Sequence, residues 1–410
     1  MSVSLTNLFF VALIAFGAPL VAAAVPRSVI PAVVLEIVAG IVFGPNGLDL
    51  IAVDDPIRVM ALLGLAFLLF LAGLEVDVSR LRGPILRAVS VAFVVSFTLA
   101  IGVGAGLLAA GRVDNVLFTA IVLCATSLGV IVPIIKDAGA VDSDFGQLVI
   151  AAASIADFAA VILLTAFFSQ QSGGVASRLV LLAAFGVAAT LVAAGLIGLR
   201  HFGAVSRVLV RLQDTTAQIR VRGAFVLLTG LVAFATSFGL ESILGAFAAG
   251  LILSFADRDP DGTHPRFRPK LEGAGYGFFI PAFFVTVGLR FDLDAVTSDA
   301  SAVASIPLFL LALLVIRGLP ALLYRELDGG MAVAAGVLQA TSLPFIVAAT
   351  MIGTELGVVS SGTAASMVGA GVLSVVLFPP LGAALIGGET ARADPSPRES
   401  PVADIELRRS

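Results

Sequence analysis

The chain has 410 residues, of which 59% are hydrophobic and only 13% are charged. A soluble domain carries about twice that charged fraction, so the composition excludes an ordinary water-soluble protein. The single cysteine, Cys124, and the two histidines exclude a disulfide framework and a histidine cluster for a metal. The formal net charge of −4 says little by itself, and we expect neither a cofactor nor a nucleic-acid partner.

Runs of about 18 or more apolar residues recur from end to end, which is the pattern of transmembrane helices. They predict an all-α polytopic membrane protein with about thirteen transmembrane helices. We expect these helices at 4–24, 28–44, 57–75, 85–110, 115–135, 145–169, 178–200, 222–238, 241–256, 274–290, 300–324, 329–352 and 360–388.

Both ends of the chain carry a local signal. The first predicted helix ends in "VAAAVP", which is similar to a signal-peptidase site. The preceding "MSVSLTN" has no Lys or Arg, so we expect the helix to be retained. Residues 389–410 are charged and contain proline, which predicts a disordered tail after a transmembrane domain at 1–388, with no appended regulatory domain.

Basic residues predict the orientation in the membrane. Most of the 24 Lys and Arg residues fall on one side if the N-terminus lies outside. By the positive-inside rule, that side is the cytoplasm. We therefore expect a multi-pass protein of the cell (inner or plasma) membrane with a cytoplasmic C-terminus.

Similar strings recur in predicted helices that lie seven apart in the chain. The pairs are "CATSLGVIV" at 124–132 with "QATSLPFIV" at 339–347, "GLEVD" at 73–77 with "GLRFD" at 288–292, and "LEIVAG" at 35–40 with "LESILG" at 240–245. An odd displacement means that the two members of each pair cross the membrane in opposite directions. The sequence therefore predicts two inverted repeats of six helices joined by a linking seventh helix, a pattern typical of secondary transporters.

The first pair of strings interrupts its apolar helices with polar residues and helix-breakers. The residues are Thr126, Ser127 and Gly129 in the fifth predicted helix, and Thr341, Ser342 and Pro344 in the twelfth. Unwound backbone is tolerated at membrane depth only where protein or a water-filled cavity satisfies it. Two such breaks would place carbonyls, hydroxyls and helix ends at the midplane, where they can replace part of a cation's hydration shell. The alternative is that these hydroxyls bond back to their own helix carbonyls.

One carboxylate lies deep in an apolar helix. In "AAASIADFAAVILL", Asp157 is about twelve residues, or roughly 18 Å, into the sixth predicted helix. An Asp at that depth costs about 2.5–3.5 kcal/mol on insertion scales, so we expect it to bind a cation or a proton. Ser154 lies three residues earlier on the same helical face and is a further candidate ligand.

Arg317, in "LLVIRGLPALL", is the one basic residue deep in a predicted helix. If it faces the broken helices, it compensates the charge of Asp157 and the exposed carbonyl ends. The alternatives are a structural ion pair with Asp157 and a snorkelling side chain. Glu36 is mid-helix and is expected to line the same cavity or a helix contact, whereas Glu75 and Glu241 near helix ends are expected to be solvated.

At these residues the sequence resembles the monovalent cation:proton antiporters, in the bacterial branch that includes Na⁺/H⁺ antiporters and glutathione-gated K⁺ efflux proteins. The matching strings, spread over about residues 5–385, are "VLEIVAGIVFGPNGL", "LGLAFLLFLAGLEVD", "ATSLGVIVPIIKDAG", "ADFAAVILL", "LGAFAAGLIL" and "FFVTVGLRFD". The resemblance implies a homodimer that exchanges a monovalent cation for a proton. It also implies that the fifth and twelfth helices are discontinuous and cross each other. It further implies a dimerising panel of helices one to three and eight to ten, and a moving core of helices four to six and eleven to thirteen.

The resemblance also implies roles for single residues. Asp157 matches the ion-carrying aspartate, Thr126 and Ser127 match ligands in the fifth helix, and Arg317 matches a basic residue of the eleventh. Ala156 departs from the pattern, because relatives carry Asp, Asn or Gln there. A K⁺ efflux channel-like protein and a bile-acid-type solute symporter remain alternatives. An intramembrane protease is excluded, because the predicted helices lack the Ser-His or paired-Asp site that it needs.

Overall fold

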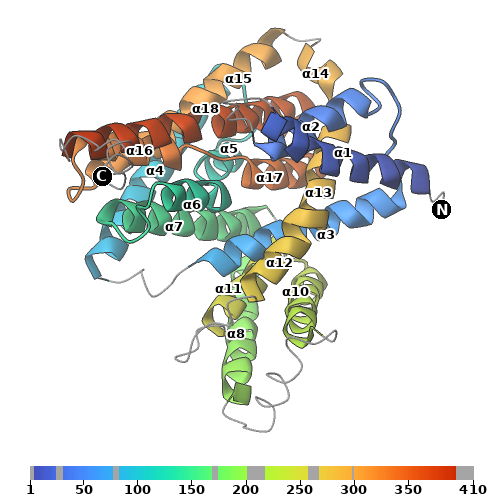
Figure 1. Cartoon of the computed structure of the whole chain (residues 1–410), viewed down its shortest axis with the longest axis horizontal. Helices are drawn as coiled ribbons and strands as arrows, with labels where there is room; N and C mark the ends of the chain where they lie inside the picture. Colours follow the sequence, from blue (N-terminus) through green and yellow to red (C-terminus); the bar gives the residue numbers. More distant parts are fainter. Residues whose placement is uncertain are drawn as a thin grey trace, which may run out of the picture.

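The computed structural model describes residues 4–24, 31–76, 83–168, 174–200, 218–256, 267–297 and 300–393. Every regular element in these ranges is a helix (Figure 1). The helices before residue 257 are α1 (Leu5–Ala24), α2 (Ala32–Phe43), α3 (Asp55–Glu75), α4 (Gly83–Ala109), α5 (Val116–Leu123), α6 (Leu128–Asp137), α7 (Asp144–Phe167), α8 (Val175–Arg200), α10 (Ile219–Ser237) and α11 (Ser242–Ala256). The later ones are α12 (Phe267–Ala274), η1 (Gly275–Phe279), α13 (Ile280–Leu289), α14 (Leu293–Thr297), α15 (Ala300–Leu313), η2 (Leu314–Gly318), η3 (Leu319–Leu323), α16 (Gly329–Gln339), α17 (Pro344–Glu355) and α18 (Ser361–Ala393).

Eleven segments of the described chain are long and apolar enough to cross a membrane. Two shorter apolar helices, at Ala32–Phe43 and Ser242–Phe255, fall where the second and ninth spans were expected. The prediction of an all-α polytopic protein is therefore confirmed, whereas the number thirteen remains a prediction.

Several predicted boundaries were wrong. The tenth predicted helix starts at Phe267 rather than 274, because α12 and the π-helical turn η1 lengthen it. The predicted tail starts too early, since α18 runs on to Ala393. Its last residues include Glu, Ala and Arg, which are good helix formers and allow the helix to continue beyond the apolar run. The rest of the predicted tail, 394–410, lies outside the described residues.

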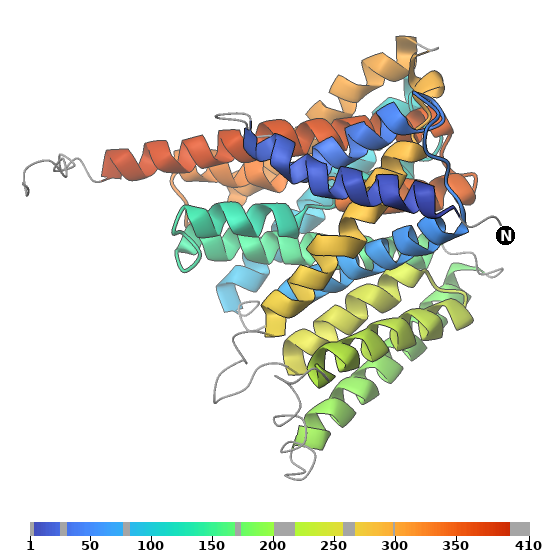
Figure 2. The same cartoon turned by 45° about the vertical axis from the view of Figure 1, so that its right-hand side comes forward.

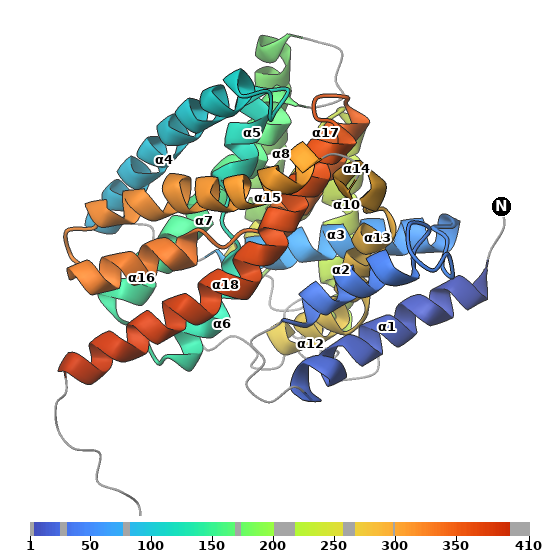
Figure 3. The same ribbon diagram turned by 90° about the horizontal axis from the view of Figure 1, so that it is seen from above.

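The helices pack in two groups. In one, α2 and α3 pack on α13, while α3 and α10 pack on α11. In the other, α15 and α16 pack on α18, and α4 packs on α5 and α7. Figure 3 shows α4, α15 and α16 on one side of the molecule and α1, α2 and α12 on the other. The helix α8 packs on α11, and Figure 2 shows α8, α10 and α11 together at the lower end of the molecule.

The contacts inside the first group follow the inverted repeat. Gly40 of α2 lies directly against Gly288 of α13, and a Cβ on either would collide with the backbone of the other helix. Gly73 of α3 and Gly250 of α11 meet opposing backbone in the same way. The second helix of each repeat therefore packs on the third helix of the other, at glycines that allow the backbones to touch.

Two spans are broken in the middle, as predicted. The helix is interrupted at 124–127 between α5 and α6, and at 340–343 between α16 and α17. The N–H of Ser127 donates to the carbonyl oxygen of Thr341 over 2.8 Å. The two breaks therefore cross and satisfy each other's backbone, which is the condition for unwound chain at membrane depth.

Candidate ion-binding site

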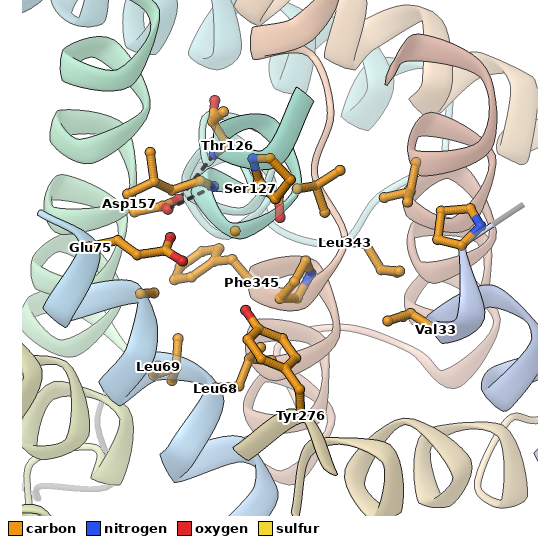
Figure 4. Close-up of a pocket in the computed structure, with 18 of the residues that line it drawn as sticks. Val33, Leu68, Leu69, Glu75, Thr126, Ser127, Asp157, Tyr276, Leu343 and Phe345 are labelled. Carbon is orange, nitrogen blue, oxygen red and sulfur yellow. Dashed lines mark hydrogen bonds between the residues drawn. The ribbon is translucent and has the colours of Figure 1, made fainter. Parts of the chain in front are cut away.

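A cavity of about 390 Å³ lies beside the first break (Figure 4). It is bounded by residues of α3, α6, α7, η1, α17 and α18, and most of its wall is apolar. Its polar lining consists of Glu75, Thr126, Ser127, Asp157 and Tyr276. The structure therefore brings three of the predicted polar site residues, together with two polar residues that were not predicted, to one space.

Asp157 is buried in α7 and caps the start of α6. The N–H of Thr126 donates to Asp157 Oδ1 at 3.3 Å, and the N–H of Leu128 donates to Oδ2 at 3.5 Å. Ser127 holds the N-cap position of α6 but makes no side-chain cap bond, so the carboxylate of α7 fills that role. A helix N-terminus favours negative charge, which helps to hold an ionised Asp157 in an apolar wall.

The hydroxyl of Thr126 is bonded across the crossing. It donates to the carbonyl oxygen of Gln339 at 2.8 Å and accepts from Arg317 Nε at 2.8 Å. The alternative of a bond back to its own helix is therefore wrong for Thr126. Its hydroxyl joins the two breaks, and the N–H of the same residue is what contacts Asp157.

Ser127 and Ser154 lie differently. Ser127 lines the cavity beside Asp157. Ser154 is buried, donates to the carbonyl oxygen of Ile150 at 2.8 Å and is not among the cavity residues. The prediction of Ser154 as an ion ligand is not supported by this position, because its hydroxyl is turned onto its own helix.

Arg317 is only 2% exposed, and the snorkelling alternative is therefore wrong. It lies in the π-helical turn η2 and donates to three side chains: Thr126 at 2.8 Å, Ser96 at 3.1 Å and Gln339 at 3.4 Å. None of these described bonds reaches Asp157, so a direct ion pair is not the arrangement found. The guanidinium instead supports the crossing, with Thr126 between it and the carboxylate.

The backbone of the second break is held by hydrogen bonds to its neighbours. The N–H of Ser342 donates to Ser374 Oγ at 3.1 Å, and the carbonyl of Thr341 accepts from Ser127. The hydroxyls of Thr341 and Ser342 are buried and have no hydrogen-bond partner in the described part of the chain. Pro344 starts α17, where its missing N–H costs nothing, and it lines the cavity.

Glu36 does not line the cavity around Asp157, so that expectation is corrected. It is buried on α2, one helical turn before Gly40, which touches α13. Residues four apart share a helix face, so Glu36 lies on the face turned toward α13. The alternative of a helix contact is the one that fits.

Two cavity residues escaped the sequence reasoning. Glu75 was expected to be solvated, yet its Oε2 is buried with no described hydrogen-bond partner. The repeated strings contained one indication: both have a charged residue at the same position, Glu75 in "GLEVD" and Arg290 in "GLRFD". Tyr276, one of two tyrosines in the chain, enters from the π-helical turn η1, and sequence periodicity gives no sign of such a turn.

The described residues contain no group of three or more His, Cys, Asp or Glu side chains that could hold a metal ion. Crossed broken helices with a buried carboxylate, that of Asp157, at the crossing define the class of the protein, a helical secondary transporter. The family described as sodium/hydrogen exchanger, transmembrane, matches residues 12–384. The chain belongs to this family, and with it to the monovalent cation:proton antiporter superfamily of multi-pass membrane proteins.

Individual relatives agree with this family assignment. The chain is 32% identical over 398 residues to YjbQ of Bacillus subtilis, named as an Na⁺/H⁺ antiporter, with 92% of this chain covered. It spans 62% of the length of that protein. It is 26% identical over 362 residues to the Na⁺/H⁺-K⁺ antiporter GerN of Bacillus cereus, covering 86% of this chain and 89% of GerN. The solved sodium proton antiporter MjNhaP1 of Methanocaldococcus jannaschii has the same fold, with a TM-score of 0.62 at 15% identity, covering 93% of this chain and 97% of that one.

Proposed function

We propose that the protein exchanges a monovalent cation, Na⁺ or K⁺, for a proton, with Asp157 as the residue that carries either one. The observation that supports this most directly is the position of its carboxylate, buried at the crossing of the broken helices and facing the cavity. Relatives named as Na⁺/H⁺ and Na⁺/H⁺-K⁺ antiporters agree with the substrate class.

The exchange follows from the cost of charge in a membrane. An ionised, empty carboxylate crosses the hydrocarbon region at high cost, whereas a protonated or cation-bound one is neutral. Only an occupied site then moves from one side to the other. Ser127 lies beside Asp157 and offers its hydroxyl as a ligand for the cation. Thr126 offers only backbone groups, because its hydroxyl is bonded to Gln339 and Arg317.

We further propose that exchange is electroneutral. One carboxylate that holds one proton or one cation exchanges them one for one. The neighbouring Ala156 cannot titrate, and an arginine such as Arg317 stays charged at physiological pH, whereas a lysine can lose its proton when buried. No second proton carrier then accompanies the cycle.

The two groups of helices suggest the moving parts. We assign the core that moves to α4–α7 and α15–α18, and the panel that forms a homodimer to α1–α3 and α10–α13, with α8 as the link. The N-terminus is assigned to the outside and the C-terminus to the cytoplasm of the cell membrane. Neither assignment is needed for the role of Asp157.

Separate cavities favour exchange over a channel. A second cavity, of about 300 Å³, is lined by Thr350, Glu355 and Arg290 and shares no lining residue with the Asp157 cavity. A channel needs a continuous polar pathway, whereas an exchanger needs the two sides to stay apart.

Purified protein in proteoliposomes with an internal pH dye tests the function. An imposed gradient of Na⁺ or K⁺ is expected to drive a proton flux of opposite direction, and choline is the control cation. Absence of proton flux with Na⁺, K⁺ and Li⁺ would refute the proposal.

A further inference from the structure

Glu75 and Tyr276 line the cavity but take no part in the hydrogen bonds around Asp157. Glu75 is the last residue of α3, and Tyr276 belongs to the π-helical turn η1. Figure 4 shows both side chains reaching into the cavity from these elements, while Asp157 reaches in from α7. The cavity therefore has a second polar wall, on the side of the panel.

Gly129 leaves a small gap between these two walls. A Cβ built on Gly129 would lie 3.4 Å from Tyr276 Oη and 3.9 Å from Glu75 Oε2, in ordinary contact with both. Apart from its chain neighbours and its own helix, no other heavy atom of the described residues lies within 4 Å of that point. The gap is thus bordered by a carboxylate oxygen and a phenol oxygen, the oxygen ligands that a hard cation prefers.

One oxygen of the Glu75 carboxylate beside this gap has no hydrogen-bond partner among the described residues. This oxygen, Oε2, is buried. The neighbouring Arg268 donates through Nη2 to the carbonyl oxygen of Leu74 at 3.1 Å. A buried carboxylate oxygen without a donor is costly, and a cation or its bound water at the gap would remove that cost.

Tyr276 is held in place by its glycine neighbour. A Cβ on Gly275 would meet Leu71 Cδ1 at 2.9 Å and Phe67 Cδ1 at 3.2 Å, so the turn lies tightly on α3. Gly277 has open space around it. Short π-helical turns inside α-helices occur often at functional sites, and this one brings the phenol to the cavity.

We propose that Glu75, Tyr276 and the gap at Gly129 form a first binding position for a partly hydrated monovalent cation, which then passes to Asp157. The proposal rests on the cation exchange proposed above. Glu75 and Tyr276 belong to the panel, whereas Asp157 belongs to the core, so the first position loads the carrier without crossing the membrane itself. Its loss therefore raises the apparent KM for the cation and leaves the maximal rate nearly unchanged.

The gap can be filled without touching Asp157. Gly129→Ala places a methyl group in it at ordinary contact distances. We expect the apparent KM for Na⁺ or K⁺ to rise severalfold in proteoliposomes, with the maximal rate within about twofold. Gly102→Ala in α4 is the matched control, because its Cβ would meet no atom of the described residues within 4 Å, and it is expected to behave as the wild type.

Tyr276→Phe and Glu75→Gln test the two oxygens together. Each is expected to raise the apparent KM, by about tenfold for the loss of a contact to a charged group. Because both oxygens serve one position, the double variant is expected to raise the apparent KM at least as much as the stronger single variant. Unchanged KM values in both single variants and in the double variant would overturn the proposal. Phe278→Leu, on the same turn but outside the cavity, controls for distortion of η1.

A binding measurement separates this position from transport. Cations that bind the folded protein raise its melting temperature. We expect Asp157→Asn to keep part of the stabilisation by Na⁺ or K⁺, and Asp157→Asn combined with Glu75→Gln to lose it. Complete loss in Asp157→Asn alone would overturn the separate position, whereas absence of proton exchange in the wild type would instead refute the proposed function.

Discussion

The hydroxyl of Thr126 donates to the carbonyl oxygen of Gln339 over 2.8 Å, and thereby joins the first break to the end of α16. The same hydroxyl accepts from Arg317 Nε. Thr126 thus sits between the guanidinium on one side and, through its N–H, the carboxylate of Asp157 on the other. This relationship divides the polar residues of the crossing into those that hold it together and those that face the cavity.

Asp157→Asn is expected to abolish exchange, because an amide neither binds a proton in this range nor neutralises a cation. The side chain keeps its size, so folding is expected to be retained. Cation-driven proton flux in proteoliposomes measures the first, and the elution volume and melting temperature of the purified protein measure the second. Persisting exchange in a well-folded variant would remove Asp157 from its assigned role.

Thr126→Val is expected to lower the maximal rate and the stability together. It removes the bonds to Gln339 and Arg317 and leaves a buried guanidinium nitrogen unpaired, at a cost of roughly 2–4 kcal/mol. Melting temperature and initial rates report the two effects.

Ser127→Ala is the matched comparison for Thr126→Val, since Ser127 faces the cavity and uses its N–H to hold the crossing. We expect a raised apparent KM for the cation with stability close to that of the wild type. A KM equal to the wild-type value would exclude the Ser127 hydroxyl as a ligand.

Electroneutral exchange predicts that membrane potential does not shift the equilibrium. If one net charge moved per cycle, 100 mV would contribute about 2.3 kcal/mol and shift the equilibrium cation gradient roughly fiftyfold. The measurement clamps proteoliposomes at zero and at about ±100 mV and finds the gradients at which net flux reverses. A reversal point that moves with voltage would reveal a second charge carrier.

Gly288→Ala is expected to destabilise the protein, by about 1–3 kcal/mol or more, as overpacking of a tight contact does. Its Cβ would meet the backbone of Ile37 and lie 2.8 Å from Gly40 Cα. Gly186→Ala in α8 is the control, because its Cβ would meet no atom of the described part of the chain within 4 Å. Equal melting temperatures for the two variants would show that α2 and α13 can separate freely.

Period and repetition were enough to predict the helical fold and the two broken spans, because both follow from where apolar runs stop; the crossing of the two breaks was implied by the family resemblance. The position of Thr126 in the first break was predictable for the same reason, whereas three arrangements were open for Arg317. Their partners were not, since spacing along a helix does not say which side chain of another helix lies opposite. Glu75 was misjudged because a helix end usually meets water, whereas this one meets α6.

Irregular helical turns are the other reason why part of the site could not be predicted from the sequence. Arg317 and Tyr276 both lie in π-helical turns, which shift the side chains out of the 3.6-residue register on which helical-face arguments depend. The residues of these turns, "GYGFF" and "LVIRG", read as ordinary apolar helix.

The contact of Gly40 with Gly288 restricts how the sequence can change over time. Most tight contacts between side chains can be relieved by a smaller residue opposite. Here the obstacle on each side is backbone, so no substitution in the facing helix makes room for a methyl group. The same holds for Gly73 and Gly250, whose added Cβ atoms would meet carbonyl oxygens. A methyl group at any of these four positions therefore meets backbone, and the packing of α2 on α13 and of α3 on α11 requires glycine at each of them.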